Sequence, residues 1–154
     1  MAKRRTKAAL AVMEEEGPDF DISMNLIDRA TASALGTIYA RYSSHSQRDV
    51  SIRQQVDDAL RYAARHNIYI VACYVDRHLT GRTDRRPDFH RMLREAEAGE
   101  WSFVVTWKND AFARNRYDAA IYKARLKKFG VRCLFSQEDI PAGPEGILLE
   151  AMLE

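Results

Sequence analysis

The sequence has few cysteines, no long apolar run and almost no net charge. Its two cysteines, Cys73 and Cys133, lack the paired spacing of a zinc site or redox motif, so we interpret both as buried, reduced thiols. No apolar run approaches the roughly 18 residues of a membrane span, and the basic N-terminus has no following secretory core. These absences exclude a membrane span and favour a soluble, cytoplasmic protein.

Motifs for metal and nucleotide binding are also lacking. The four histidines have no ligand spacing with one another. No Gly-rich phosphate loop follows the first apolar run. A formal net charge of +2 does not by itself indicate a nucleic-acid binder.

Arginine, by contrast, is abundant: 18 of the 24 basic residues are arginine. The planar guanidinium offers a fork of donors that suits phosphate. The length of 154 residues and the 46% apolar content predict one compact domain with an appendage. Residues 1–34 form this N-terminal extension, partly helical around 24–32. We expect it to pack on the surface of the main domain, residues 35–141, with binding to a partner or a flexible extension as the alternatives.

Strand and helix patterns alternate four times from Gly36 onward. Strands are predicted at 37–42, 68–75, 103–107 and 131–135. Helices are predicted to begin at Ser51 and Pro87 and to span about 119–129, with Gly99 and Gly130 closing the last two. This order predicts an α/β fold, a three-layer sandwich with a mostly parallel central sheet. In such folds the site lies beyond the carboxyl ends of the strands.

Charged and hydroxyl side chains follow three of these strands. The residues concerned are Arg41, Ser43 and Ser44 at the end of the first strand, Asp76, Arg77 and Arg86 after the second, and Asp110, Arg114 and Arg116 after the third. Because the carboxyl ends of parallel strands share one edge, arginines from three loops are expected to meet beside hydroxyl groups. The pattern indicates phosphate chemistry.

These stretches form ordered motifs. They run from Tyr39 to Ser44, from Gln47 to Ser51 with Gln55 beyond, from Tyr74 to Asp76, from Thr80 to Pro87, and from Trp107 to Asn115. The set resembles the catalytic domain of the serine site-specific recombinases, the resolvase/invertase family. The resemblance is greatest to its large-integrase and transposon branch.

The resemblance implies a catalytic set. Ser43 would be the nucleophile that joins a DNA 5′ phosphate and releases a 3′ hydroxyl, with Ser44 as the alternative. The matching positions that hold the phosphate or support the site are Arg41, Arg86, Arg114, Asp110, Gln55, Asp76 and Tyr39. The family needs no metal or other cofactor, so none is expected here.

One position departs from the family pattern. Where the family has arginine after the aspartate of its third motif, this chain has Ala111. Loss of one preorganised charge donor costs about 10²–10³ in rate, so cleavage is expected to be weak or absent. Arg116 could compensate only by reaching back across a helix start.

The last residues, 142–154, match the start of the long helix through which the family dimerises. A separate DNA-binding domain follows that helix in the family. We therefore expect weak DNA binding by this chain, a homodimer, and a tetramer in the active synapse. We interpret the chain as a fragment or truncated form of a longer protein.

Two other functions remain open on the sequence. A non-catalytic module that dimerises with an active recombinase and regulates it fits Ala111, although the intact Ser43 argues against it. A response-regulator or nucleotide-binding domain fits the alternating pattern alone, and the missing Gly-rich loop weighs against it.

Overall fold

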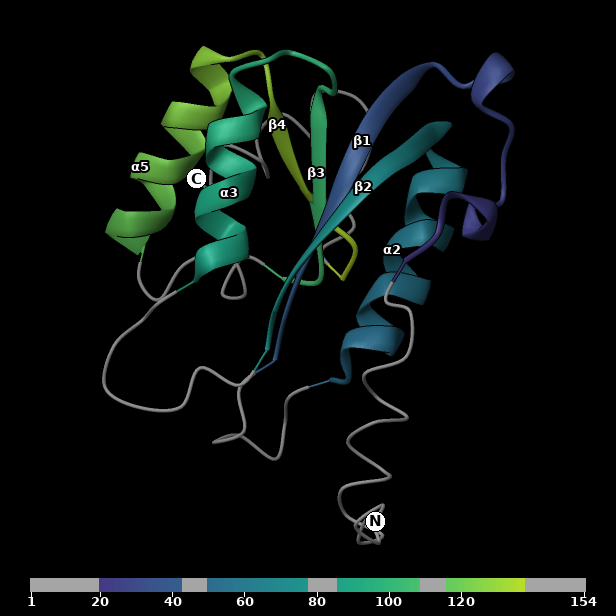
Figure 1. The fold of residues 1–154 in the computed structure, drawn as a ribbon, viewed down its shortest axis with the longest axis horizontal. Coiled ribbons are helices and arrows are strands. Elements are labelled where there is room, and N and C mark those ends of the chain that lie inside the picture. Colours follow the sequence, from purple (N-terminus) through teal and green to yellow (C-terminus); the bar gives the residue numbers. More distant parts are fainter. Residues whose placement is uncertain (1–19, 43–49, 78–85, 109–115, 138–154) are drawn as a thin grey trace, which may run out of the picture.

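The computed structural model describes residues 20–42, 50–77, 86–108 and 116–137, which form a sheet covered by helices on both faces (Figure 1). Four strands stand in the order β2-β1-β3-β4, and each described pair is parallel. Their bounds are Ala34–Tyr42 for β1, Ile68–Arg77 for β2, Phe103–Thr106 for β3 and Arg132–Phe135 for β4. The predicted three-layer α/β sandwich is confirmed, with a fully parallel described sheet.

The helices divide between the two faces of the sheet. Helix α2 (Ile52–Arg65) covers one face, and α3 (Pro87–Ala96) with α5 (Arg116–Lys128) covers the other (Figure 1). Right-handed crossovers explain this division, because β2 lies to one side of β1 and β3 to the other, so the two connections pass over opposite faces. Among the described residues, no helix combines the length and apolar character of a membrane span.

Helices α2 and α3 each bury an apolar stripe against the sheet. Val56, Ala59 and Leu60 of α2 pack with Ile38 and Ile70 of the sheet. The opposite core contains apolar side chains from α3, α5 and the sheet, among them Phe89, Met92, Leu93, Leu126 and Val104. These two cores fix the carboxyl edge of the sheet, where the site is expected.

The segment predicted as one helix at 24–32 instead forms two 3-10 helices, η1 (Ile22–Met24) and η2 (Arg29–Thr31). Asn25 ends η1 and binds β2: its Oδ1 accepts from the Ile70 N–H at 2.9 Å, and its Nδ2 donates to the Ile70 carbonyl at 2.8 Å. A continuous helix would forgo this pairing, because residue 25 has an extended ψ of 137°. Long-range hydrogen bonds thus override the local helical pattern.

Helix boundaries agree closely with the sequence. The Ser51 hydroxyl accepts from the Gln54 N–H at 3.2 Å and caps α2. Gly99 and Gly130, with φ of 72° and 77°, follow α3 and α5 as predicted. After α2 the left-handed position belongs to Asn67, with φ 56°, whose side chain donates to the Ser33 hydroxyl at 2.7 Å.

Cys73 and Cys133 form no disulfide, and both are half-buried rather than buried. Cys73 lies on β2 and Cys133 on β4, which are the two outer strands of the described sheet. An outer strand has a neighbour on one side only, so its side chains are covered less completely. The predicted full burial is therefore wrong for both residues.

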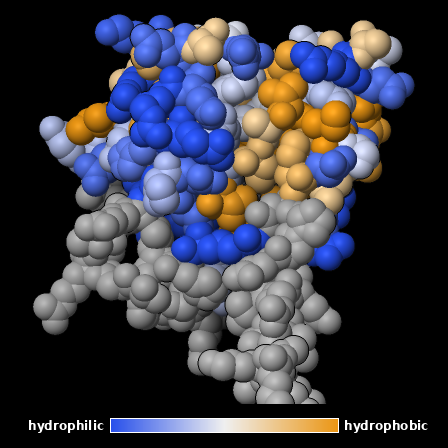
Figure 2. Space-filling view, viewed as in Figure 1, coloured by the Kyte–Doolittle hydropathy of each residue, from blue (hydrophilic) through white to orange (hydrophobic). Residues whose placement is uncertain are grey.

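The face of the molecule in Figure 2 has a hydrophilic region and a hydrophobic region. Hydrophilic side chains gather over α3, and apolar ones gather toward β2 and the segment 20–33. Ile22 and Leu26 in that segment are 56% and 64% exposed. The outer side of β2 is therefore bordered by apolar surface.

Candidate active site at the carboxyl edge of the sheet

The ends of β1 and β2 place two predicted site residues side by side. Arg41 and Asp76 are direct register partners on these parallel strands. Arg41 is half-buried, whereas Asp76 is only 2% exposed. The central strand β1 also lies at the point where the strand order reverses, which is where open α/β sheets bind their ligands.

Asp76 joins β1 to the start of α3. Its Oδ2 accepts from the Tyr39 hydroxyl at 2.8 Å and from the Phe89 N–H at 3.0 Å, and its Oδ1 accepts from the Asp88 N–H at 3.0 Å. The residue at the N-cap of α3, Arg86, makes no side-chain capping bond. Asp76, which lies on β2, therefore caps α3 by accepting hydrogen bonds from backbone N–H groups of its first turn.

Arg86 packs against two aromatic rings that contact each other. Its guanidinium carbon lies 4.2 Å from the Phe89 ring centroid and 5.6 Å from that of Tyr122, and the residue is 3% exposed. Stacking of this kind suits arginine, whose planar cation is weakly hydrated. The structure thus presents a fixed, largely desolvated positive charge at the start of α3.

Burial and nearby charges shift the pKa of the Tyr39 hydroxyl. Burial raises its pKa well above the usual value, and the charge of Asp76 and its hydrogen bond raise it further. The positive charges of Arg86 and Arg41 act in the opposite direction. Of these three groups, Asp76 contacts the phenol directly, through the hydrogen bond from the Tyr39 hydroxyl.

Gln55 binds the end of β1 from the first turn of α2. Its side-chain amide contacts the backbone of Arg41 and of Val50 through three hydrogen bonds. The side chain is 5% exposed. The structure thus brings together five of the eight predicted site residues: Tyr39, Arg41, Gln55, Asp76 and Arg86.

The resolvase N-terminal domain family model matches residues 37–154 of this chain. The chain belongs to the resolvase family of serine recombinases. This family carries out site-specific recombination of DNA. Membership removes the response-regulator and nucleotide-binding alternative, which the strand order alone would have allowed.

Solved structures agree with this assignment in fold. The N-terminal catalytic domain of TP901-1 integrase is 24% identical, with a TM-score of 0.64 over 77% of this chain and 90% of that one. A resolvase family site-specific recombinase from Streptococcus pneumoniae is 24% identical, with a TM-score of 0.63 over 77% and 83%. A serine recombinase from Sulfolobus solfataricus is 25% identical, with a TM-score of 0.50 over 75% and 76%. No curated protein matches the chain.

Three predicted members of the recombinase site lie outside the described residues: Ser43, Asp110 and Arg114. The alternative nucleophile Ser44 and the departing position Ala111 also lie outside them. Their roles stay predictions.

Sequence reasoning missed the aromatic support of Arg86. It gave Phe89 and Tyr122 no role in the site, whereas both rings lie beside the Arg86 guanidinium. The separation of Arg86 and Phe89 by three residues was a usable signal, because residues three apart at a helix start are neighbours. Tyr122 comes from another helix and left no such signal.

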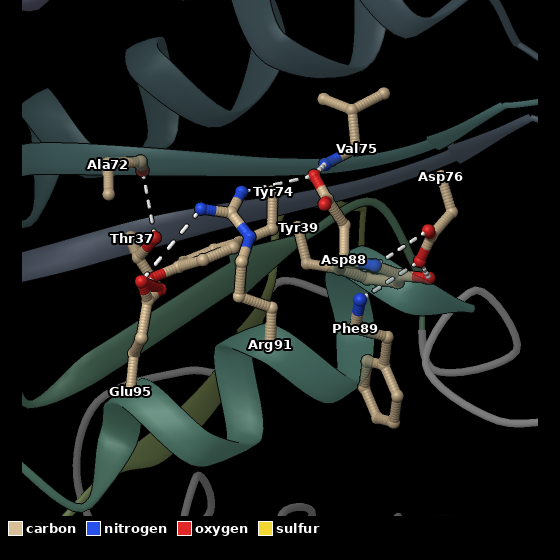
Figure 3. A network of polar contacts seen from close by, with 10 residues as sticks. All are labelled: Thr37, Tyr39, Ala72, Tyr74, Val75, Asp76, Asp88, Phe89, Arg91 and Glu95. Atoms are coloured by element: carbon tan, nitrogen blue, oxygen red, sulfur yellow. Dashed lines mark hydrogen bonds and ion pairs between the residues drawn. The ribbon is translucent and has the colours of Figure 1, made fainter.

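A second polar network of the recombinase domain fixes α3 against β2 (Figure 3). The Tyr74 hydroxyl donates to Glu95 Oε2 at 2.5 Å, and the Val75 N–H donates to Asp88 Oδ2 at 2.9 Å. Arg91 lies between the two carboxyl groups, 3.3 Å from Asp88 and 3.8 Å from Glu95, with its guanidinium 4.7 Å from the Tyr74 ring centroid. Both ends of α3 are thereby tied to the strand that carries Asp76.

This network predicts a loss of stability at alkaline pH. Burial, the hydrogen bond to Glu95 and the charge of Glu95 raise the pKa of Tyr74 above its usual value. A raised folded-state pKa stabilises the fold fully below about pH 10, and this contribution declines as the pH rises above that value. We expect Tyr74→Phe to unfold more easily at pH 7 and to lose less stability between about pH 9 and 11.

Urea unfolding followed by circular dichroism across this pH range measures the difference. Tyr117→Phe removes a hydroxyl from a tyrosine that is 75% exposed and serves as the matched control. Tyr39 also contributes to the alkaline decline, so the slope of Tyr74→Phe is expected to shrink without vanishing. An unchanged slope would contradict the assignment to Tyr74.

Proposed function

We propose that this chain is the DNA-cleaving domain of a serine recombinase and that Ser43 is its nucleophile. The Ser43 oxygen attacks a backbone phosphorus, the new O–P bond forms, and the bond from phosphorus to O3′ breaks. The serine proton leaves and the released 3′ oxygen gains one, giving a 3′ hydroxyl. Attack of a 3′ hydroxyl on the phosphoserine reverses the step, so strands are resealed without a nucleotide cofactor.

One observation supports the proposal: at the carboxyl edge of the sheet, Asp76 pairs in register with Arg41, accepts from the Tyr39 hydroxyl and binds the start of α3, whose N-cap residue is Arg86. Ser43 follows Arg41 by two residues in the sequence. Preorganised guanidinium groups neutralise the charge that grows on a phosphate in the transition state. In this proposal Arg41 and Arg86, with Arg114, supply that charge.

The Arg86 guanidinium must become exposed before it can contact a DNA phosphate. At 3% exposure its guanidinium is almost inaccessible in this structure. Contact with a DNA phosphate therefore requires a rearrangement that exposes the cation while Phe89 and Tyr122 continue to orient it. In the proposal, DNA binding supplies that rearrangement.

Covalent trapping tests the proposed chemistry. The substrate is a pool of random-sequence duplexes with sulfur in place of O3′ at one phosphate, because the departing 3′ thiolate reseals poorly and the adduct accumulates. The adduct is measured on denaturing gels. In the Ala111→Arg background, we expect Ser43→Ala to form no adduct and Ser44→Ala to retain it; an adduct that persists in Ser43→Ala contradicts the proposal.

Assembly follows from the same chemistry. Each Ser43 cleaves one strand, so a double-strand break needs two copies and exchange between two duplexes needs four. We propose a dimer that binds DNA weakly and a tetramer at the exchange step. Sedimentation equilibrium that shows a strict monomer at high concentration would contradict the dimer.

A non-catalytic module that pairs with an active recombinase is the second candidate. Ala111 in the third motif and the burial of Arg86 favour it. It predicts that neither this chain nor its Ala111→Arg variant forms an adduct, while the chain still associates with an active recombinase.

A further inference from the structure

Gln55 makes an unusual pair of contacts with one strand residue. Its Oε1 accepts from the Arg41 N–H at 3.3 Å, and its Nε2 donates to the Arg41 carbonyl at 2.9 Å. A side-chain amide that binds both backbone groups of one residue replaces the partner that a neighbouring strand would supply. Asn25 does the same for Ile70 on β2.

The position of Arg41 explains why such a partner is needed. Strand β3 pairs with β1 from Gly36 to Ile38, three residues short of Arg41. The side of β1 that faces β3 thus loses its strand neighbour where the site begins. A partly buried N–H and C=O left unpaired there would each be costly, and Gln55 satisfies both.

The same amide also binds the residue that follows the Ser43 segment in the sequence. Its Nε2 donates to the Val50 carbonyl at 2.8 Å. Arg41 precedes residues 43–49 and Val50 follows them. One buried side chain therefore links the point where the chain leaves β1 to the point where it enters α2.

We propose that Gln55 is a positioning residue that sets the location of Ser43 by holding both ends of its segment. The inference rests on the proposed function, in which Ser43 is the nucleophile. Gln55 acts through the backbone of Arg41 and Val50 and does not contact the phosphate. Displacing a reacting group by about 1 Å can cost about 10²-fold in rate, so this kind of support controls turnover more than binding.

Gln55→Glu tests the two hydrogen bonds that the Gln55 amide donates separately from the one that it accepts. The variant has the same shape and keeps an acceptor for the Arg41 N–H, but it loses the N–H groups that bind the two carbonyls. Gln54→Glu, one residue earlier on the same helix and exposed, introduces the same charge and is the matched control. Gln55→Met, neutral and apolar, fills the buried position without any hydrogen bond and covers the case in which the glutamate variant fails to fold.

Two measurements on the full chain test the proposal. In the Ala111→Arg background, single-turnover adduct formation on the sulfur-substituted duplexes is expected to slow at least about tenfold in Gln55→Glu and Gln55→Met. The half-saturating DNA concentration is expected to change by less than about threefold. In Gln55→Met, which removes the acceptor of the Arg41 N–H, amide hydrogen exchange at Arg41 is expected to accelerate at least about tenfold, with Ile38 unchanged.

The outcomes are distinct. Unchanged exchange at Arg41 with unchanged maximal rate overturns the positioning role, as does a loss confined to DNA affinity. If no adduct forms even with Gln55 intact, the proposed function fails, and exchange alone then decides whether Gln55 holds the segment. Equal effects from Gln54→Glu would show that charge, rather than the clamp, is responsible.

Discussion

Ala111→Arg is expected to raise the rate of covalent Ser43–DNA adduct formation by about 10²–10³-fold. The family places arginine directly after the aspartate of its third motif, where this chain has Asp110 followed by Ala111. An added guanidinium would offset charge on the phosphate oxygens only when it is held near them, as Arg86 is held by its aromatic neighbours. Single-turnover trapping on the sulfur-substituted duplexes measures the gain.

Ala113→Arg is the matched control for this result. It adds the same charge two residues farther along the same stretch, so it reproduces any general increase in attraction to DNA. We expect that variant to lower the half-saturating DNA concentration without raising the maximal rate. Equal maximal rates for the original chain and Ala111→Arg would show that residue 111 does not limit cleavage.

Asp76→Asn is expected to lower the free energy of unfolding by about 3 kcal/mol. The buried carboxyl group accepts three hydrogen bonds and donates none: Tyr39, Asp88 and Phe89 are all donors to it. An asparagine in either orientation turns its NH₂ group toward at least one of these donors. Urea unfolding at neutral pH measures the loss.

Asp57→Asn makes the same chemical change at an exposed position of α2 and is expected to alter stability by less than about 0.5 kcal/mol. If Asp76→Asn remains folded at low urea, adduct formation in the Ala111→Arg background is also expected to slow, because the start of α3 carries Arg86. Equal stability of the two aspartate variants would contradict the role assigned to Asp76.

The fold and part of the site follow from local sequence patterns. Apolar spacing predicted α2, and the continuous apolar run from Ile68 predicted β2, because both patterns record which faces are buried. The positions of Arg41 and Asp76 followed from the parallel sheet, since strand ends of equal direction share an edge.

The remaining features depend on contacts between distant residues. Asn25 binds a strand residue 45 positions away, and this bond replaced the predicted helix by two 3-10 turns. The capping of α3 by Asp76 likewise depends on how β2 and α3 are placed. Neither contact can be read from the spacing of residue types, because each side chain binds backbone N–H or C=O groups, which do not depend on the residue type.

The hydrogen bonds of Asn25 and Asp88 to β2 also bear on how copies of this domain can associate. They occupy the Ile70 N–H and C=O and the Val75 N–H on the outer strand, beside the exposed apolar side chains of Ile22 and Leu26. An incoming strand would have to break these bonds before it could extend the sheet. Extension of the sheet at the β2 edge by a strand from a second copy is thereby disfavoured.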